Sequence, residues 1–260
     1  KGQAKGFERK PYFLVGEYNK NADVQIVLIG KGVMFDSGGL SLKSPAGMDT
    51  MKTDMAGAAT AWGVMSLISK HKVDIGLTVF TPIVENMPSG SAIRPGDVLK
   101  ARNGKTIEVL NTDAEGRLIM ADALAYASER NPDLICDVAT LTGASYVALG
   151  LDIGAVFSNN KKIEDKFIKS TENSKENFYP LPLHSGYKKL IESDIADMKN
   201  TGGRFGGAIT AALLLENFTN GLDWVHLDIA GPARSSNRKG ATGFSVLTLF
   251  EFFKSFSKNH

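Results

Sequence analysis

Charged side chains are concentrated in two short segments that are otherwise apolar or rich in glycine. These are residues 30–39 (GKGVMFDSGG), together with positions 43 and 54 beyond them, and residues 111–118 (NTDAEGRL). The charged residues concerned are Lys31, Asp36, Lys43, Asp54, Asp113, Glu115 and Arg117. An unpaired charge costs several kcal/mol to bury. Two divalent metal ions about 3.5 Å apart with shared ligands would roughly neutralise the four carboxylates, so these residues indicate a metal site.

The three cationic residues suit a hydrolytic metal site. Next to divalent cations, a lysine such as Lys31 or Lys43 can lose its proton and become a nitrogen ligand, or keep it and polarise a carbonyl oxygen. Arg117 stays protonated, and its planar guanidinium suits an anion bound beside the metals. Each side chain also has an ordinary interpretation, as an exposed lysine or an exposed helix arginine. Their occurrence together with the four carboxylates favours the metal site.

Asp54 provides a separate indication of a buried carboxylate. A helix expected over residues 53–70 places it on an apolar face. That face also carries Met51, Ala58, Trp62 and Met65. The alternative is a solvated position near the start of the helix, where the helix dipole favours an acid.

Short apolar runs alternate with segments of helical periodicity. The expected strands are residues 24–29, 76–84, 106–110, 134–140, 155–158 and 224–229. The expected helices are residues 53–70, 115–128, 162–173, 186–195, 208–218 and 245–257. This order predicts an α/β fold in which a mixed, largely parallel central sheet is sandwiched between helices. Both charged segments follow expected strands, and ligands gather at the carboxyl ends of strands in such sheets.

Length and composition, with 43% hydrophobic and 22% charged residues, favour one large domain over residues 1–260 rather than two small ones. The net charge of +2 gives no reason to expect a nucleic-acid or membrane partner. No apolar stretch approaches the roughly 20 residues that span a bilayer, and residues 1–10 lack the hydrophobic segment of a signal peptide. A single cysteine, Cys136, excludes an intrachain disulfide and favours a reduced, cytoplasmic compartment.

Residues 111–118 resemble the signature of the leucyl aminopeptidase family of dinuclear metallopeptidases. Further matching segments are residues 30–39, 48–55, 139–144 and 226–231, so the resemblance runs nearly from end to end. It implies a metal-dependent aminopeptidase, an exopeptidase that releases N-terminal amino acids from peptides. A leucine-type preference is expected.

The resemblance also implies the metal ligands. Asp36 and Glu115 would bridge two divalent ions, zinc or manganese. Asp113 would complete one site. Lys31 and Asp54 would complete the other, where the free amine of the substrate would also bind.

Lys43 and Arg117 match catalytic positions of the family. In the mechanism so implied, a metal-bridging water attacks the scissile carbonyl, Lys43 and a metal stabilise the oxyanion, and Arg117 holds a bicarbonate that shuttles protons. The substrate-binding positions implied by the resemblance are Met51, Thr140, Leu141, Gly143 and Ala241. Ala241 is smaller than the residue that some members carry there, which leaves the preference for leucine itself open.

Family members normally carry an additional N-terminal α/β domain, which this chain does not contain, so the chain is either a catalytic fragment or a shorter member. The catalytic domains of the family form homohexamers, and the same assembly is expected here.

Two other functions remain open from the sequence. A two-metal phosphoesterase would share the carboxylate cluster, but gives no reason for a lysine ligand or for an amine-binding Asp54. A noncatalytic DNA-binding protein would need a broad basic face, against which the near-neutral charge argues.

Overall fold

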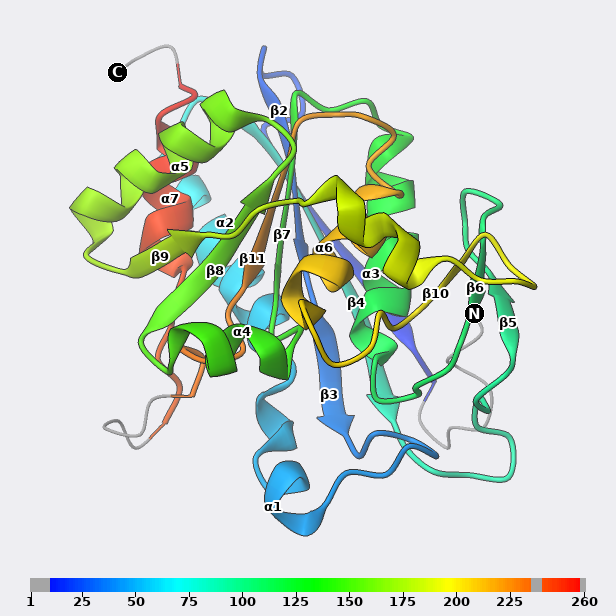
Figure 1. Ribbon diagram of the computed structural model, residues 1–260. Coiled ribbons are helices and arrows are strands. Elements are labelled where there is room, and N and C mark those ends of the chain that lie inside the picture. The colour runs from blue at the N-terminus through cyan, green and yellow to red at the C-terminus, as the bar shows by residue number, and fades with distance from the viewer. Residues whose placement is uncertain (1–9, 235–239, 258–260) are drawn as a thin grey trace.

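The computed structural model describes residues 10–234 and 240–257, and a mixed β-sheet forms its centre (Figure 1). This sheet has eight strands in the order β1-β4-β2-β7-β11-β8-β9, with β3 paired to β4 beside that path. The strands are β1 (Tyr12–Tyr18), β2 (Gln25–Gly30), β3 (Gly32–Asp36), β4 (Gly76–Asn86), β7 (Leu134–Ala139), β8 (Ile153–Ser158), β9 (Asn177–Pro180) and β11 (Trp224–Asp228). Strands β4, β2, β7 and β11 run parallel, whereas β1 and β8 are antiparallel to their neighbours β4 and β11. The predicted mixed, largely parallel sheet is therefore confirmed.

Helices cover both faces of the sheet (Figure 1). The α-helices are α1 (Pro45–Met48), α2 (Ala56–Lys70), α3 (Glu115–Ser128), α4 (Gly143–Leu149), α5 (Lys161–Ser174), α6 (Gly207–Glu216) and α7 (Val246–Lys254). Helices α3 and α6 pack against each other over one hydrophobic cluster, and α2, α5 and α7 pack over a second. Because both faces are covered, the central strands β2 and β7 are almost entirely buried, which explains their continuous apolar sequences.

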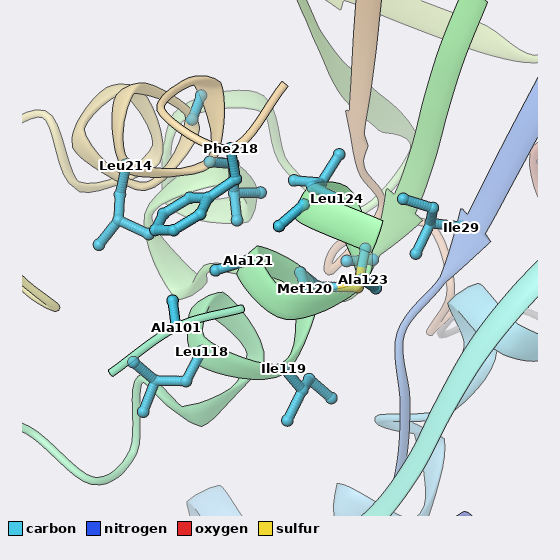
Figure 2. Close-up of a cluster of buried hydrophobic side chains, with 14 of the residues drawn as sticks. Ile29, Ala101, Leu118, Ile119, Met120, Ala121, Ala123, Leu124, Leu214 and Phe218 are labelled. Carbon is cyan, nitrogen blue, oxygen red and sulfur yellow. The ribbon is translucent and has the colours of Figure 1, made fainter. Parts of the chain in front are cut away.

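The cluster under α3 and α6 holds these helices against the sheet (Figure 2). Met120 and Leu124 of α3 lie with Leu214 of α6 and Phe218 beyond it, and Ile29 of β2 closes the cluster from the sheet. Fully burying a side chain of this size contributes about 1.5–3 kcal/mol. The cluster therefore fixes α3, whose first residues carry Glu115 and Arg117.

Two predicted elements differ from the structure. Residues 106–110 do form a strand, β6 (Thr106–Glu108), but it lies in a separate three-stranded sheet between β10 (Met198–Lys199) and β5 (Val98–Lys100). Residues 186–195 were predicted to be an α-helix, yet the structure has a 3-10 helix, η3 (Ser185–Ile191), in which Ile191 is the buried residue. An α-helix without a continuous apolar face gains little from packing.

Candidate active site

The charged residues of the two sequence segments converge at one edge of the main sheet. Lys31 directly follows β2, and its backbone N–H donates to the carbonyl of Val138 on β7 at 3.1 Å. Asp36 ends β3, which continues the direction of β2. Glu115 begins α3. The site therefore forms where strand ends meet the amino end of a helix, as expected, although the strand before Glu115 belongs to the smaller sheet.

Three buried carboxylates form the centre of the site. Asp36, Asp54 and Glu115 are 3%, 4% and 1% exposed, and each offers an oxygen within 4.8 Å of the others. The Lys31 ammonium lies between two of them, with Nζ 2.8 Å from Asp54 Oδ2 and 2.8 Å from Glu115 Oε1. It also donates to the carbonyl oxygen of Thr140 at 3.2 Å. The predicted cluster is thus present in the fold.

Asp54 reaches the cluster from a different local structure than predicted. It caps the 3-10 helix η2 (Met51–Thr53) and precedes α2, so it does not belong to the helix expected over residues 53–70. Trp62, assigned to the same buried face, is 36% exposed. The burial of Asp54 therefore comes from the junction between η2 and α2, and not from helical periodicity.

Lys43 joins the fourth carboxylate, that of Asp113, to the cluster. Its Nζ lies 2.9 Å from Asp36 Oδ2 and also forms an ion pair with Asp113 Oδ1. When all four carboxyls are ionised, they meet only two ammonium groups, so two negative charges are then left uncompensated by these ion pairs.

Burial and like charge perturb these groups strongly. Burial raises the pKa of the Glu115 carboxyl to about 8, and the charges of Asp36 and Asp54 add to this while Lys31 opposes it. Burial likewise raises the pKa of Asp54, against the attraction of Lys31. Burial on its own would lower the pKa of Lys31, but the neighbouring carboxylates outweigh it and the pKa lies above its usual value.

The donor set fits a bound metal ion. Glu115 Oε2 is buried and accepts no hydrogen bond from the described residues, which is costly for a carboxylate oxygen. Carboxylate oxygens with one lysine nitrogen suit zinc or manganese. A divalent cation would satisfy the Glu115 oxygen and remove the excess negative charge.

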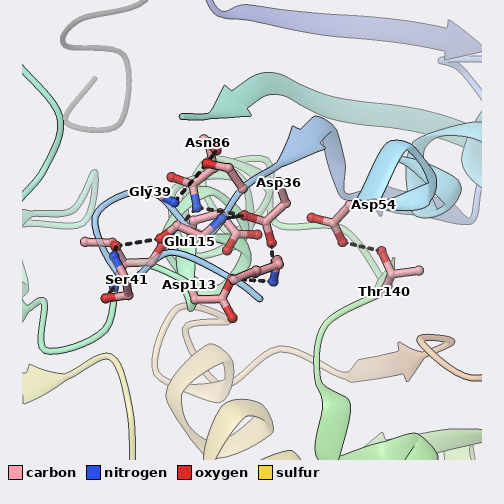
Figure 3. Close-up of polar contacts among 12 residues, drawn as sticks. Asp36, Gly39, Ser41, Asp54, Asn86, Asp113, Glu115 and Thr140 are labelled. Carbon is pink, nitrogen blue, oxygen red and sulfur yellow. Dashed lines mark hydrogen bonds and ion pairs between the residues drawn. The ribbon is translucent and has the colours of Figure 1, made fainter. Parts of the chain in front are cut away.

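Neighbouring groups hold the carboxylates in place. Asp36 Oδ1 accepts hydrogen bonds from Asn86 Nδ2 at 2.8 Å and from the backbone N–H of Gly38 at 2.9 Å. Asp54 Oδ1 accepts one from Thr140 Oγ1 at 2.8 Å (Figure 3). Gly38 has φ +86°, and a Cβ there would lie 2.3 Å from the carbonyl oxygen of Ser41, so the turn that carries Asp36 requires glycine.

Arg117 lies beside the cluster on α3. It is 9% exposed, and its Nη1 donates to the carbonyl of Asn200 at 2.9 Å. Burial lowers the pKa of its guanidinium to about 10, while Asp228 and Glu115 oppose that shift. It therefore remains a cation at neutral pH, as the sequence predicted.

The expected substrate-binding residues fall into two groups. Met51 is buried in η2, and Thr140, Leu141 and Gly143 lie on the segment that follows β7. Ala241 lines a cavity of about 490 Å³ that Lys52 and Thr53 of η2 also line, although its described lining includes none of the other four expected residues. Other residues of that cavity include Thr50, Ala56, Thr60, Arg234 and Phe244.

Sequence reasoning did not find several supporting residues. Asn86 binds Asp36, and Asn200 accepts from Arg117 while its own side chain holds the backbone of residues 110 and 111. Thr112 ties the two charged segments together, since it donates to the carbonyl of Gly38 at 2.6 Å and accepts from the N–H of Ser41 at 2.7 Å. A polar residue at the end of a buried strand was the available signal for Asn86.

The chain matches known proteins over nearly its whole length. Residues 2–250 match the model of the cytosol aminopeptidase family, catalytic domain. The chain belongs to this family. The resemblance drawn from the sequence is thereby confirmed.

Relatives within the cytosol aminopeptidase family include two bacterial proteins described as probable cytosol aminopeptidases. The protein from Syntrophotalea carbinolica is 48% identical over 96% of this chain and 52% of its own length. That from Chlorobaculum parvum is 49% identical over 97% of this chain and 52% of its own length. The chain thus spans about half the length of these curated relatives.

A solved structure is also similar. The bottromycin maturation enzyme BotP, determined in complex with Mn, superposes with a TM-score of 0.93 at 38% identity, covering 98% of this chain and 58% of BotP. This likeness extends over nearly the whole chain and supports the α/β fold.

Proposed function

We propose that residues 1–260 form the catalytic domain of a metal-dependent aminopeptidase, which releases N-terminal amino acids, with a leucine-type preference, from peptides. The observation that carries the proposal is the buried cluster of Asp36, Asp54 and Glu115, whose negative charge Lys31 and Lys43 compensate only in part. Membership of the cytosol aminopeptidase family supports the same reaction.

The cofactor of this proposal is a pair of divalent metal ions, zinc or manganese. The residues that would hold them are Lys31, Asp36, Asp54, Asp113 and Glu115. The oxygen-rich donor set and the Mn complex of BotP support this choice. Such ions, when bound, supply an activated water at neutral pH and polarise a carbonyl oxygen.

The side chains around the cluster have separate roles. Lys43, which is half-buried and charged, stabilises negative charge that develops on the scissile carbonyl oxygen. Arg117 has five N–H donors, of which the described hydrogen bond to Asn200 uses one, so its guanidinium can hold a bicarbonate ion. Asp54, buried beside Thr140, attracts the free amine of the substrate.

The substrates are peptides with a free N-terminus, and Met51, Thr140, Leu141, Gly143 and Ala241 contact them. We further propose a homohexamer and a cytoplasmic location. No helix among residues 10–234 and 240–257 has both the length and the apolar character needed to cross a bilayer. A net charge of +2 leaves nucleic acid without a broad electrostatic attraction.

The test is hydrolysis of leucine p-nitroanilide by chelator-stripped protein, with zinc or manganese added back. Activity should require metal and disappear in Glu115→Ala. The matched control is Glu129→Ala, which removes an exposed carboxylate that pairs with Arg102. Hydrolysis of a phosphodiester without hydrolysis of the anilide would favour the two-metal phosphoesterase instead.

A further inference from the structure

Residues 226–231 match the family in sequence but include none of the expected metal ligands, catalytic residues or substrate-binding residues. The acidic residue among them, Asp228, ends β11 and is 1% exposed. Strand β11 lies beside β7 in parallel, with Asp228 opposite Ala139. Asp228 therefore lies next to the segment that leaves β7 and passes the metal centre.

The Asp228 carboxylate binds that segment directly. Its Oδ1 accepts from the backbone N–H of Leu141 at 3.2 Å, and its Oδ2 accepts from Thr142 Oγ1 at 2.6 Å. A third donor, the N–H of Ala230, lies 3.2 Å from Oδ1. Hydrogen bonds to a carboxylate are stronger than neutral ones, so Asp228 restrains the backbone of residues 141–142.

Thr142 extends this restraint to the next helix. Its hydroxyl donates to Asp228 and at the same time accepts from the N–H of Ser145 at 3.1 Å, which makes Thr142 the N-cap of α4. The path of the chain from β7 into α4 is therefore fixed from β11.

The preceding residue connects the same segment to the metal centre. Thr140 accepts from Lys31 Nζ at 3.2 Å through its carbonyl and donates to Asp54 Oδ1 at 2.8 Å through its hydroxyl. A shift of residues 141–142 would move these two contacts, because Thr140 adjoins Leu141. Small displacements of such supporting groups weaken metal sites measurably.

We propose that Asp228 is a positioning residue, which holds the segment 140–142 so that Thr140 stays in contact with Lys31 and Asp54 and the backbone beyond it stays aligned for substrate. This role rests on the proposed metal centre. It predicts that loss of the Asp228 carboxylate changes metal affinity and KM, whereas a merely structural acid would change stability alone.

The test compares Asp228→Asn, Thr142→Val and the control Thr142→Ser, which keeps the hydroxyl. Mn²⁺ is titrated into chelator-stripped protein by calorimetry, and KM and kcat are measured with leucine p-nitroanilide. We expect Asp228→Asn and Thr142→Val to weaken one of the two Mn²⁺ binding events about tenfold. Both should raise KM more than they lower kcat, and Thr142→Ser should stay within twofold of the wild type.

A double variant, Asp228→Asn with Thr142→Val, adds a second criterion. Since the two side chains share the hydrogen bond between Asp228 Oδ2 and Thr142 Oγ1, its loss of affinity should be smaller than the sum of the two single losses. Additive losses, or a folded Asp228→Asn whose Mn²⁺ affinities and KM are both within twofold of the wild type, overturn the proposal. If Asp228→Asn does not fold, the Mn²⁺ affinities and KM of Thr142→Val, compared with those of Thr142→Ser, decide whether the proposal holds.

Failure of the proposed function would look different. Wild-type protein that binds two Mn²⁺ ions without hydrolysing the anilide would refute the aminopeptidase, and the calorimetric comparison would still decide the role of Asp228. Wild-type protein that binds no Mn²⁺ would overturn both.

Discussion

Replacing Gly116 with alanine should separate metal binding from folding stability. Gly116 lies in the first turn of α3, and a Cβ built there would be 2.7 Å from Lys31 Nζ and 2.8 Å from Lys31 Cε. Ordinary contacts begin near 3.4 Å, so the tip of Lys31 must retreat by about 0.7 Å, the difference between 3.4 and 2.7 Å. Metal–ligand distances tolerate only about 0.2 Å. The displaced lysine would no longer match the position of a ligand.

The fold itself should accept the change. Alanine is favoured over glycine inside a helix by up to about 1 kcal/mol, and the atoms that the new Cβ meets first are the far end of a flexible side chain. We therefore expect the metal-free Gly116→Ala protein to unfold within about 1 kcal/mol of the wild type. Its Mn²⁺ affinity should fall at least about tenfold.

Calorimetric Mn²⁺ titration and denaturant unfolding in chelator measure these two quantities. The control is Gly90→Ala, since a Cβ at Gly90 meets no atom within 4 Å. Two results would refute the reasoning. Unchanged Mn²⁺ affinity in Gly116→Ala would mean that the position of Lys31 does not matter, and a loss of several kcal/mol without metal would mean that the backbone, and not the lysine, takes up the strain.

Three further predictions concern the same cluster. The metal-free protein should lose stability as pH rises from about 4.5 toward 8, because the pKa of Glu115 is about 8 in the folded state and 4.5 ordinarily, so the folded state holds the proton more tightly. Urea unfolding measured at a series of pH values should show that the free energy of unfolding falls less steeply with pH in Glu115→Gln than in the wild type. An equal slope in the two proteins would contradict this. Lys43→Gln should lower kcat about 10²–10³-fold, as loss of an oxyanion donor does, while calorimetry shows Mn²⁺ binding no weaker than in the wild type; a parallel loss of binding would assign Lys43 to the metals. Asn86→Ala should weaken Mn²⁺ binding about tenfold by releasing Asp36, with Asn103→Ala as an exposed control, and unaltered binding would count against the supporting role.

Local sequence patterns predicted the elements whose burial is continuous. The α-helix over residues 115–128 and the strands β2 and β7 follow from runs of apolar residues, because both faces of these strands are covered. The edge strand β1 was missed, since its exposed residues follow no buried pattern. The strand at residues 106–110 was wrongly expected in the main sheet. It pairs instead with β5 and β10, and local sequence does not reveal which strands pair with each other.

The candidate site was predictable because buried charged residues are costly to the fold and stand out in an apolar sequence. Lys31, Asp36 and Glu115 are charged residues in apolar surroundings, which a sequence displays directly. Asn86 and Asp228 are ordinary polar residues. Their hydrogen-bond partners, Asp36 and Leu141, lie 50 and 87 positions away in the sequence, so these contacts can be identified only in the folded structure. The roles of Met51 and Ala241 in substrate binding remain predictions.

The two lysines inside the carboxylate cluster also bear on the order of events when the protein is made. Lys31 and Lys43 form ion pairs with all four carboxylates. These opposite charges reduce the repulsion among the carboxylates that the chain must overcome as it folds. Folding of a new chain should therefore depend less on metal supply than the onset of activity does.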